Sequence, residues 1–284
     1  MDKQINVAAN SKRIRSVFKY PGSKQLMLST LFKHLPKTGD VLCEPFVGSA
    51  SVALNTNYRR YLLNDANPDL IRAFKLCRDY PIELISELRS LLSDQNNNPE
   101  TYYSYRKHFN ASTCKDERAI MLFYFSQIGF NGLLRVNSRN ELNVPYGDGR
   151  SAYLPESEIH TFAEKMQNAE FFCMDFEYFI AMCSQISGRK NQYLDPPYID
   201  TDNGRKTYTQ YTAQGFSLDD HARINSVLSF YKSKFEHTLV SNHQSPRLKS
   251  TYSGLSRLVR FRVPRTISSK ASNRVPAGEV IMYY

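Results

Sequence analysis

The sequence predicts an α/β fold in which one open sheet is interrupted by an inserted block. Short apolar runs typical of buried strands alternate with helical patterns near both ends of the chain. Several of these runs end in a loop that carries a glycine or an acid, as strands do at the ligand edge of α/β sheets. The pattern in the middle of the chain instead predicts helices followed by a hairpin. We therefore expect a sheet domain made of residues 1–66 and 151–284, with residues 67–150 inserted into it.

The first part of the sheet domain contains two strand signals and the loops that follow them. Residues 1–16 are polar, and a turn-rich loop comes next. Pro68 is expected at the first turn of the helix after the second strand, where its missing N–H costs nothing. The expected elements are a helix over 25–35, a strand over 41–43, a short helix ending at Asn55 and a strand over 61–63.

The insert begins as several helices with few strand signals. Helical periodicity is clearest over 82–92 and 118–127. Residues 129–147 then favour a β-hairpin with its turn at 138–140.

The predicted hairpin carries side chains that can read nucleic acid. Arg135 and Arg139 can each bond guanine through two N–H groups, and Asn131 can pair in the same way with adenine. Phe130 and Leu133 are apolar, and such side chains can wedge between base steps. An ordinary exposed hairpin is the alternative explanation.

The second part of the sheet domain returns to alternating strands and helices. A long polar loop at 199–217 interrupts it, and loops of this length often act as lids or substrate clamps. The expected elements are a helix over 156–167, a strand over 170–174, a strand ending before Asp195, a helix starting at Ser217, a strand over 238–242 and strand-like runs at 257–263 and 279–284.

Strand, glycine-bearing loop, helix, strand and acid, in that order, form a nucleoside-binding arrangement. Gly48 lets the backbone approach a ligand closely, and Asp65 can take both hydroxyls of a ribose. Asp175, which follows the strand over 170–174, can accept a hydrogen bond from an adenine amine. A plain turn at Gly48 and helix caps at Asp65 and Asp175 are the alternatives.

A second polar stretch follows the next apolar strand. Asp195 comes where this strand meets its loop, so its carboxylate is expected to face a ligand cleft. Pro196 and Pro197 fix the backbone and lack an N–H, which leaves the Pro196 carbonyl rigidly aimed. Tyr198 adds a flat aromatic face. Two acceptors beside a ring suit a planar ligand with an NH₂ group, such as a nucleobase, although a plain turn also explains these residues.

The charge of the chain favours a polyanionic partner. Its 284 residues carry a net charge of +10, with an isoelectric point near 9.3. Residues 1–38 hold eight basic side chains and one acid, and residues 237–278 hold eight basic side chains and no acid. Two basic ends suit a surface shaped for phosphates, and a generic basic protein is the alternative.

Cysteine and histidine usage points to a reduced chain without a metal. The five cysteines form no C-x-x-C pair, and Cys43 and Cys173 fall in apolar runs where we expect core positions. The histidines show no metal-ligand spacing, so we expect no metal. No segment approaches the ~18 consecutive apolar residues of a membrane span, so we expect no membrane partner.

Taken together and in order, these motifs resemble the Dam-type DNA adenine-N6 methyltransferases. The likeness runs from Phe18 to Tyr284. It is carried by the segments 19–24 (KYPGSK), 44–48 (EPFVG), 64–65 (ND), 129–133 (GFNGL), 143–145 (NVP), 195–198 (DPPY), 241–243 (SNH) and 265–269 (RTISS).

The resemblance implies a Rossmann-like methyltransferase sheet that binds S-adenosylmethionine, with the helical and β-hairpin insert acting as the target-recognition domain. It implies transfer of a methyl group to N6 of an adenine flipped out of double-stranded DNA, with GATC as the usual target. The implied catalytic residues are Asp195, Pro196, Pro197 and Tyr198. The implied cofactor contacts are Tyr20, Lys24, Phe46, Gly48, Asp65, Asp175 and Asp195. The implied DNA contacts are Lys19, Phe130, Asn131, Leu133, Arg135 and Pro145, to which hairpin chemistry adds Arg139.

The chain departs from the family pattern at three positions. Ala50 replaces the second glycine of the cofactor loop, Phe130 replaces an intercalating tyrosine, and Tyr20 replaces a tryptophan. Alanine is small, so we expect cofactor binding to survive, and phenylalanine keeps the wedge without the hydroxyl.

Three other functions remain open on the sequence. They are methylation of cytosine N4, whose amine has the same geometry, DNA binding without catalysis, and methylation of RNA or protein. We expect a monomer, of which more than one copy can bind DNA. We place it in the cytoplasm with the nucleoid, or in the host-cell cytoplasm if a virus encodes it.

Overall fold

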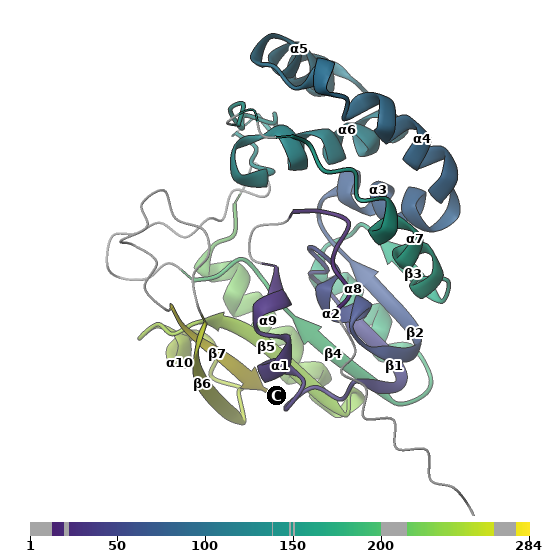
Figure 1. The fold of residues 1–284 in the computed structure, drawn as a ribbon. Helices are drawn as coiled ribbons and strands as arrows, with labels where there is room; N and C mark the ends of the chain where they lie inside the picture. Colours follow the sequence, from purple (N-terminus) through teal and green to yellow (C-terminus); the bar gives the residue numbers. More distant parts are fainter. Residues whose placement is uncertain are drawn as a thin grey trace, which may run out of the picture.

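The fold was examined in a computed structural model of the chain. It describes residues 13–19, 23–137, 139–147, 149, 151–199, 215–263 and 277–284. One seven-stranded mixed sheet organises the structure, so the expected Rossmann-like α/β class is confirmed (Figure 1).

The strands lie in the order β3-β2-β1-β4-β5-β7-β6. The first five are parallel to their neighbours, whereas β7 runs antiparallel between β5 and β6. Because β1 lies between β2 and β4, the strand order reverses there, and such a switch point is where α/β sheets bind ligands. The strands are β1 (Thr38–Glu44), β2 (Asn57–Asn64), β3 (Ala169–Phe172), β4 (Lys190–Leu194), β5 (His237–His243), β6 (Arg257–Val263) and β7 (Ala277–Tyr283).

Helices cover both faces of the sheet because neighbouring strand residues point to opposite sides. Val41 and Cys43 pack in the core beneath α8 and α9, whereas Leu42 joins the core on the other face. The α-helices of the sheet domain are α1 (Leu28–Leu31), α2 (Ser51–Leu54), α7 (Glu156–Lys165), α8 (Phe176–Gln185), α9 (Leu218–Tyr231) and α10 (Leu248–Thr251). Short 3₁₀ turns are η1 (Lys24–Leu26) and η4 (Lys232–Lys234).

The insert supplies four further α-helices, three of which begin with a proline. Proline suits the first helical turn, and asparagine side chains cap two of these helices at Asn67 and Asn98. Their elements are α3 (Pro68–Asp79), α4 (Pro81–Leu91), η2 (Asp94–Asn96), α5 (Pro99–Ala111), α6 (Lys115–Ile128) and η3 (Phe130–Gly132). Figure 1 shows α4, α5 and α6 together at one end of the molecule, away from β6 and β7.

The apolar core of the insert is continuous with the core under one face of the sheet. Phe18, which precedes the sheet in the chain, packs its ring 4.3 Å from Phe123 of α6 and 5.8 Å from Phe74 of α3. Within the insert, Arg118 of α6 forms a two-pronged ion pair with Asp69 of α3. The insert and the sheet are packed together through apolar side chains that share one core.

Three expectations from the sequence are wrong in detail. The single helix over 25–35 is instead η1 followed by α1, and within this range Met27, Leu28, Leu31 and Leu35 are buried but Leu26 is exposed. The hairpin over 129–147 forms only two isolated antiparallel bridges among its described residues. Cys173 lies just past the end of β3 and is exposed, because the strand ends one residue earlier. In the part of the chain that the structure describes, no helix is long and apolar enough to cross a membrane.

Candidate active site

Asp195 lies where β4 ends, beside the switch point of the sheet. Every residue of β4 is buried, so the acid is the first polar group that the chain presents at this edge. Lys24 of η1 donates to its Oδ2 atom at 2.7 Å, with only a tenth of the lysine side chain exposed. The other oxygen, Oδ1, is buried and has no hydrogen-bond partner among the described residues. An acceptor with this surrounding can take a hydrogen bond from a ligand.

Burial raises the pKa of Asp195 above its usual value, because a carboxylate loses its hydration there. The charge and hydrogen bond of Lys24, followed by the hydroxyl of Tyr198, lower the pKa and favour the ionised form. The pair therefore holds a partly desolvated carboxylate whose one open oxygen is a strong acceptor.

Tyr198 lies beside the same pair, in contact with Lys24. The ammonium of Lys24 lies 4.7 Å from the centre of its ring, and the imidazole of His243 meets it edge-on at 4.4 Å. Its hydroxyl donates to Glu279 of β7 at 3.2 Å. Pro196 is buried and Pro197 is half-buried between the acid and the ring in the chain. Of the four predicted catalytic residues, Asp195 and Tyr198 have direct contacts with Lys24.

Two residues to which the sequence assigned no role hold this loop. Asn242 of β5 accepts a hydrogen bond from the backbone N–H of Ile199 at 3.1 Å. His221 of α9 is buried, contacts the Tyr252 hydroxyl at 2.5 Å and hydrogen-bonds the Pro197 carbonyl. Burial lowers the pKa of His221 to about 4, although Asp220 and the Pro197 carbonyl raise it. A lone histidine in a helix carries no sequence signal for such a contact.

Glu44, the last residue of β1, is a second buried acid near Asp195. It is 1% exposed, and its Oε1 atom has no hydrogen-bond partner among the described residues. Burial raises its pKa well above the usual range, with a smaller contribution from the charge of Asp195. The sequence shows Glu44 as an acid at the end of an apolar run, but it predicts no function for this residue.

Gly48 and Asp65, which the sequence predicts to bind a nucleoside, are also in contact. The backbone N–H of Gly48 donates to Oδ2 of Asp65 at 3.0 Å, and that of Asn67 donates to Oδ1 at 3.0 Å. Each oxygen keeps a further lone pair for a ligand hydroxyl. Burial raises the pKa of Asp65, and these N–H donors oppose the rise.

The cofactor loop contains two residues in the left-handed backbone region. Gly48 adopts φ +47°, which glycine accepts readily, and Ala50 adopts φ +56°. Ala50, at the position of the family's second glycine, therefore keeps the left-handed backbone that glycine adopts easily. This conformation has a steric cost for alanine.

Asn64, at the end of β2, joins two neighbouring loops. Its amide donates to the carbonyls of Pro45 and Met174, and its oxygen accepts from the Met174 N–H. Asp175 follows Met174 and caps α8 by accepting from the Glu177 N–H at 2.9 Å, and both of its oxygens accept from Nη2 of Arg223 at 2.9 Å. The helix cap considered for Asp175 is thus present.

Phe46 completes the predicted set around the cofactor loop. Its ring lies 5.4 Å from Phe176 and 5.8 Å from Phe216, which gives an aromatic cluster at the switch point. Tyr20 lies outside the described residues.

The predicted DNA contacts gather around η3. Phe130 is 44% exposed, and its N–H donates to the Pro145 carbonyl at 3.0 Å. Asn131 is exposed in the left-handed region at φ +55°, and Leu133 is half-buried. A Cβ built on Gly132 would lie 3.0 Å from Cβ of Lys19, so this lysine packs directly against the η3 turn.

The two arginines of this segment differ in their partners. Arg135 is partly buried and donates through Nε to Asn143 at 2.9 Å. Arg139 is exposed and pairs with Glu141 at 3.1 Å. Pro145 is exposed beside Phe130, so an aromatic ring, amides and cations share one surface.

This arrangement fits a nucleoside ligand. Asp65 offers acceptors for ribose hydroxyls, Gly48 allows close approach of the backbone, and the cluster around Phe46 offers aromatic faces. No group of three or more metal-binding side chains occurs within the described ranges.

Comparison with known proteins gives a consistent result. A family model described as D12 class N6 adenine-specific DNA methyltransferase matches residues 20–265. The chain is 36% identical over 275 residues to the DNA adenine methylase of Salmonella typhi, covering 96% of both chains. It is 35% identical over 273 residues to that of Escherichia coli K12, covering 96% of both, and 36% identical over 272 residues to that of Haemophilus influenzae, covering 95% of this chain and 93% of the relative.

Proposed function

The chain belongs to the D12 class of N6 adenine-specific DNA methyltransferases, and from this premise we propose that it methylates a flipped adenine in the duplex sequence GATC, with S-adenosylmethionine as methyl donor. The names of its relatives, DNA adenine methylase, support the substrate base. The family resemblance supports the target sequence.

One observation carries the proposal: the open oxygen of Asp195. This oxygen is buried, lacks a partner among the described residues, and belongs to a carboxylate whose other oxygen is held by Lys24 at 2.7 Å. An adenine amine has two hydrogens to donate. Asp195 accepts one and the Pro196 carbonyl accepts the other, which raises the electron density on N6.

Reaching N6 requires the adenine to leave the base stack. Flipping costs a few kcal/mol, and stacking on the ring of Tyr198 recovers part of that cost. Correct placement of the amine supplies most of the acceleration, since such positioning is worth roughly 7–11 kcal/mol. The proton leaves N6 after transfer, when the amine is cationic and acidic.

The residues around the switch point hold the methyl donor. Asp65 accepts its ribose hydroxyls, and Phe46, Gly48 and Asp175 line the same pocket with Tyr20 and Lys24. S-adenosylmethionine supplies a methyl group on a positively charged sulfur, which is already a good leaving group. Transfer in line with this bond needs neither a metal nor a covalent intermediate on the chain.

Residues 67–150 form the target-recognition domain in this proposal, and residues 1–66 and 151–284 form the catalytic domain. Arg135 and Asn131 read base edges, Phe130 wedges into the duplex, and Arg139 adds charge at the hairpin turn. The remaining predicted contacts to base edges are Lys19, Leu133 and Pro145. The protein acts as a monomer on DNA in the cytoplasm.

Incubation with S-adenosylmethionine and a GATC-containing duplex tests the proposal. We expect protection from a nuclease that cuts only unmethylated GATC, and N6-methyladenine after digestion to nucleosides. A duplex with one base pair of GATC changed, and the matching RNA, serve as controls and should stay unmodified.

Other outcomes identify the alternatives. Detection of N4-methylcytosine would show that the substrate base is cytosine and not adenine. Duplex binding without measurable binding of S-adenosylmethionine would mark a protein that binds DNA without catalysis. Modification of the RNA control would overturn the choice of duplex DNA.

A further inference from the structure

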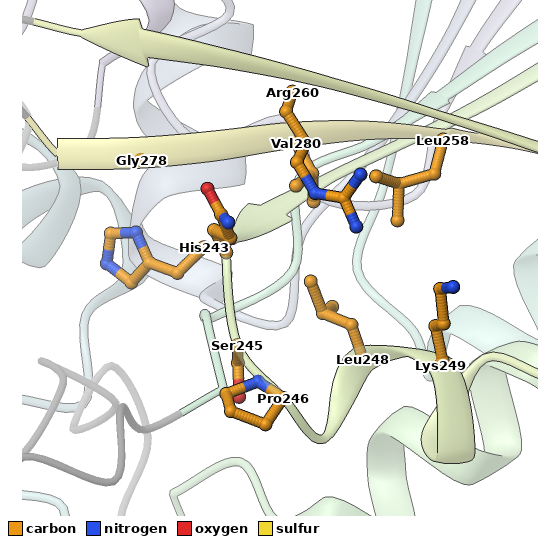
Figure 2. A pocket seen from close by; sticks show the side chains of 10 residues that line it. His243, Ser245, Pro246, Leu248, Lys249, Leu258, Arg260, Gly278 and Val280 are labelled. Atoms are coloured by element: carbon orange, nitrogen blue, oxygen red, sulfur yellow. The ribbon is translucent and has the colours of Figure 1, made fainter.

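A second hollow lies beyond the active-site end of β5, outside the residues assigned above. It has a volume of about 480 Å³ and is bounded by β6 and β7 on one side and by the segment from His243 to α10 on the other. Figure 2 shows Arg260 pointing from the sheet into this space, with Leu248 and Lys249 approaching from α10. We call it the Lys249–Arg260 groove.

The floor of the groove is apolar and held in place by the core. Leu248 is 2% exposed and Val280 is fully buried, and both belong to the core under α8 and α9. The backbone N–H of Gln244 donates to the Gly278 carbonyl at 3.0 Å, which ties the end of β5 to β7. The hollow is therefore formed before any ligand arrives.

The rim of the groove carries positive charge only. Lys249 and Arg260 are exposed, and neither forms a hydrogen bond or ion pair with another described residue. None of the lining residues is acidic. Arg262 is exposed and lies two residues further along β6, on the face that also carries Arg260. Such a rim attracts an anion.

The groove and the proposed active site share one residue. His243 is among the lining residues of the groove, and its imidazole meets the ring of Tyr198 at 4.4 Å. Tyr198 in turn lies three residues after Asp195 in the loop that follows β4. A polymer whose base enters beside Asp195 therefore passes its backbone close to Lys249 and Arg260.

We propose that the Lys249–Arg260 groove binds phosphates of the DNA strand that carries the target adenine. This proposal rests on the proposed function, because it takes duplex DNA as the substrate. The cations on the rim bond the phosphates, and the apolar floor at Leu248 and Val280 lies against the deoxyribose rings between them. The groove holds the strand on the side of the flipped base opposite the recognition segment around Phe130.

The test uses two double variants of the full chain with equal loss of charge. Lys249→Ala/Arg260→Ala removes the groove cations. Arg189→Ala/Lys234→Ala removes two exposed cations near the amino ends of β4 and β5, at the far edge of the sheet. All four side chains are exposed, so melting temperatures near that of the wild type should show that both proteins fold.

Affinity for a GATC duplex and for an unrelated duplex is then measured over a range of NaCl concentrations. Each lost phosphate contact reduces the slope of log K against log salt by about 0.9. We expect the groove variant to lose about 1–2 units of slope and roughly threefold or more in affinity, equally on both duplexes. The control variant should follow the wild type.

A second measurement locates the contact on the DNA. Phosphates beside the target adenine are replaced one at a time by uncharged methylphosphonates. Neutralising a phosphate held by the groove should weaken binding of the wild type and leave the groove variant unaffected. An unchanged salt slope, or equal sensitivity of both proteins at every position, overturns the proposal. Failure of the wild type to methylate the duplex instead overturns the proposed function.

Discussion

Asp195 combines one engaged oxygen and one open oxygen, and this asymmetry leads to a prediction at the scale of a residue. In Asp195→Asn the shape stays similar, but an NH₂ group can face the adenine amine and one acceptor is lost. We expect kcat to fall by about 10²–10⁴-fold while duplex affinity changes little. Asp40→Asn, at the opposite edge of the sheet, serves as the control. Equal loss of binding and methylation would contradict this role.

His221 gives a second prediction, which concerns pH. Its folded-state pKa of about 4 lies below the ordinary 6.5, so the folded protein binds this proton less tightly than the unfolded chain. The contribution of this pKa difference to the free energy of unfolding is fully present above pH 6.5 and is lost as the pH falls through the folded-state pKa. We expect His221→Gln to remove roughly 3 kcal/mol from the pH dependence of the free energy of unfolding over this window.

Denaturant unfolding at several pH values between 7 and 4 measures this difference. His237→Gln, at an exposed histidine at the start of β5, is the control. If both variants lose stability towards acid as steeply as the wild type, His221 does not have the assigned role. Because His221 also bonds the Pro197 carbonyl, we expect its variant to lower kcat more than it changes the affinity for DNA.

At the scale of an element, the segment from η3 to Pro145 is held by single contacts rather than by a regular ladder. Two isolated bridges and the bond between Arg135 and Asn143 shape it. A β-hairpin with its turn at 138–140 was expected here, and Val136 and Leu142 do pair as antiparallel partners. Between them, the backbone N–H of Asn137 donates to the Glu141 carbonyl at 2.9 Å, and the Asn137 side chain donates to the Glu141 carboxylate at 2.8 Å.

Arg135 carries the prediction that belongs to this segment. Arg135→Ala should reduce discrimination at one base pair of the target by about 1–3 kcal/mol, because a two-pronged contact to a base edge is lost. The measurement is kcat/KM on GATC and on duplexes with single substitutions in it. Arg139→Ala, whose side chain is paired with Glu141, is the matched variant. A uniform loss on every duplex would instead make Arg135 a phosphate contact.

At the scale of the whole molecule, polar contacts between its helices help to hold the insert together. Arg118 bonds Asp69 at 3.0 and 2.7 Å, donates to the Phe109 carbonyl at 2.7 Å and stacks 4.1 Å from the Phe109 ring. It therefore connects α3, α5 and α6. Both ends of its ion pair are largely buried, so removal of one partner leaves the other unsatisfied.

Arg118→Ala should lower the free energy of unfolding by about 1–3 kcal/mol and the melting temperature by several degrees. Arg89→Ala is the comparison, since its pair with Glu156 is exposed and should contribute less than about 1 kcal/mol. Thermal unfolding of both variants measures how much stability each ion pair contributes. Equal melting temperatures would show that the ion pair does not hold the insert.

The sequence alone determined which segments are strands, which acids follow them and which family the chain belongs to. Apolar periodicity is local, and Asp65 and Asp195 are visible because each ends an apolar run. The break between η1 and α1 was not visible, since the same apolar stripe serves one helix or two short turns. Cys173 was misassigned because the exact end of a strand depends on its neighbours.

Only the tertiary structure decided which of these residues meet. Lys24 reaches Asp195, and His221 reaches Pro197, because β1 and β4 are neighbours in the sheet and α9 packs beneath the loop after β4. The Lys249–Arg260 groove likewise joins α10 to β6, with β7 between β5 and β6 in the sheet. Periodicity reports which face of an element is buried, whereas strand order is set by packing the whole core. Contacts between distant segments therefore had to come from the fold.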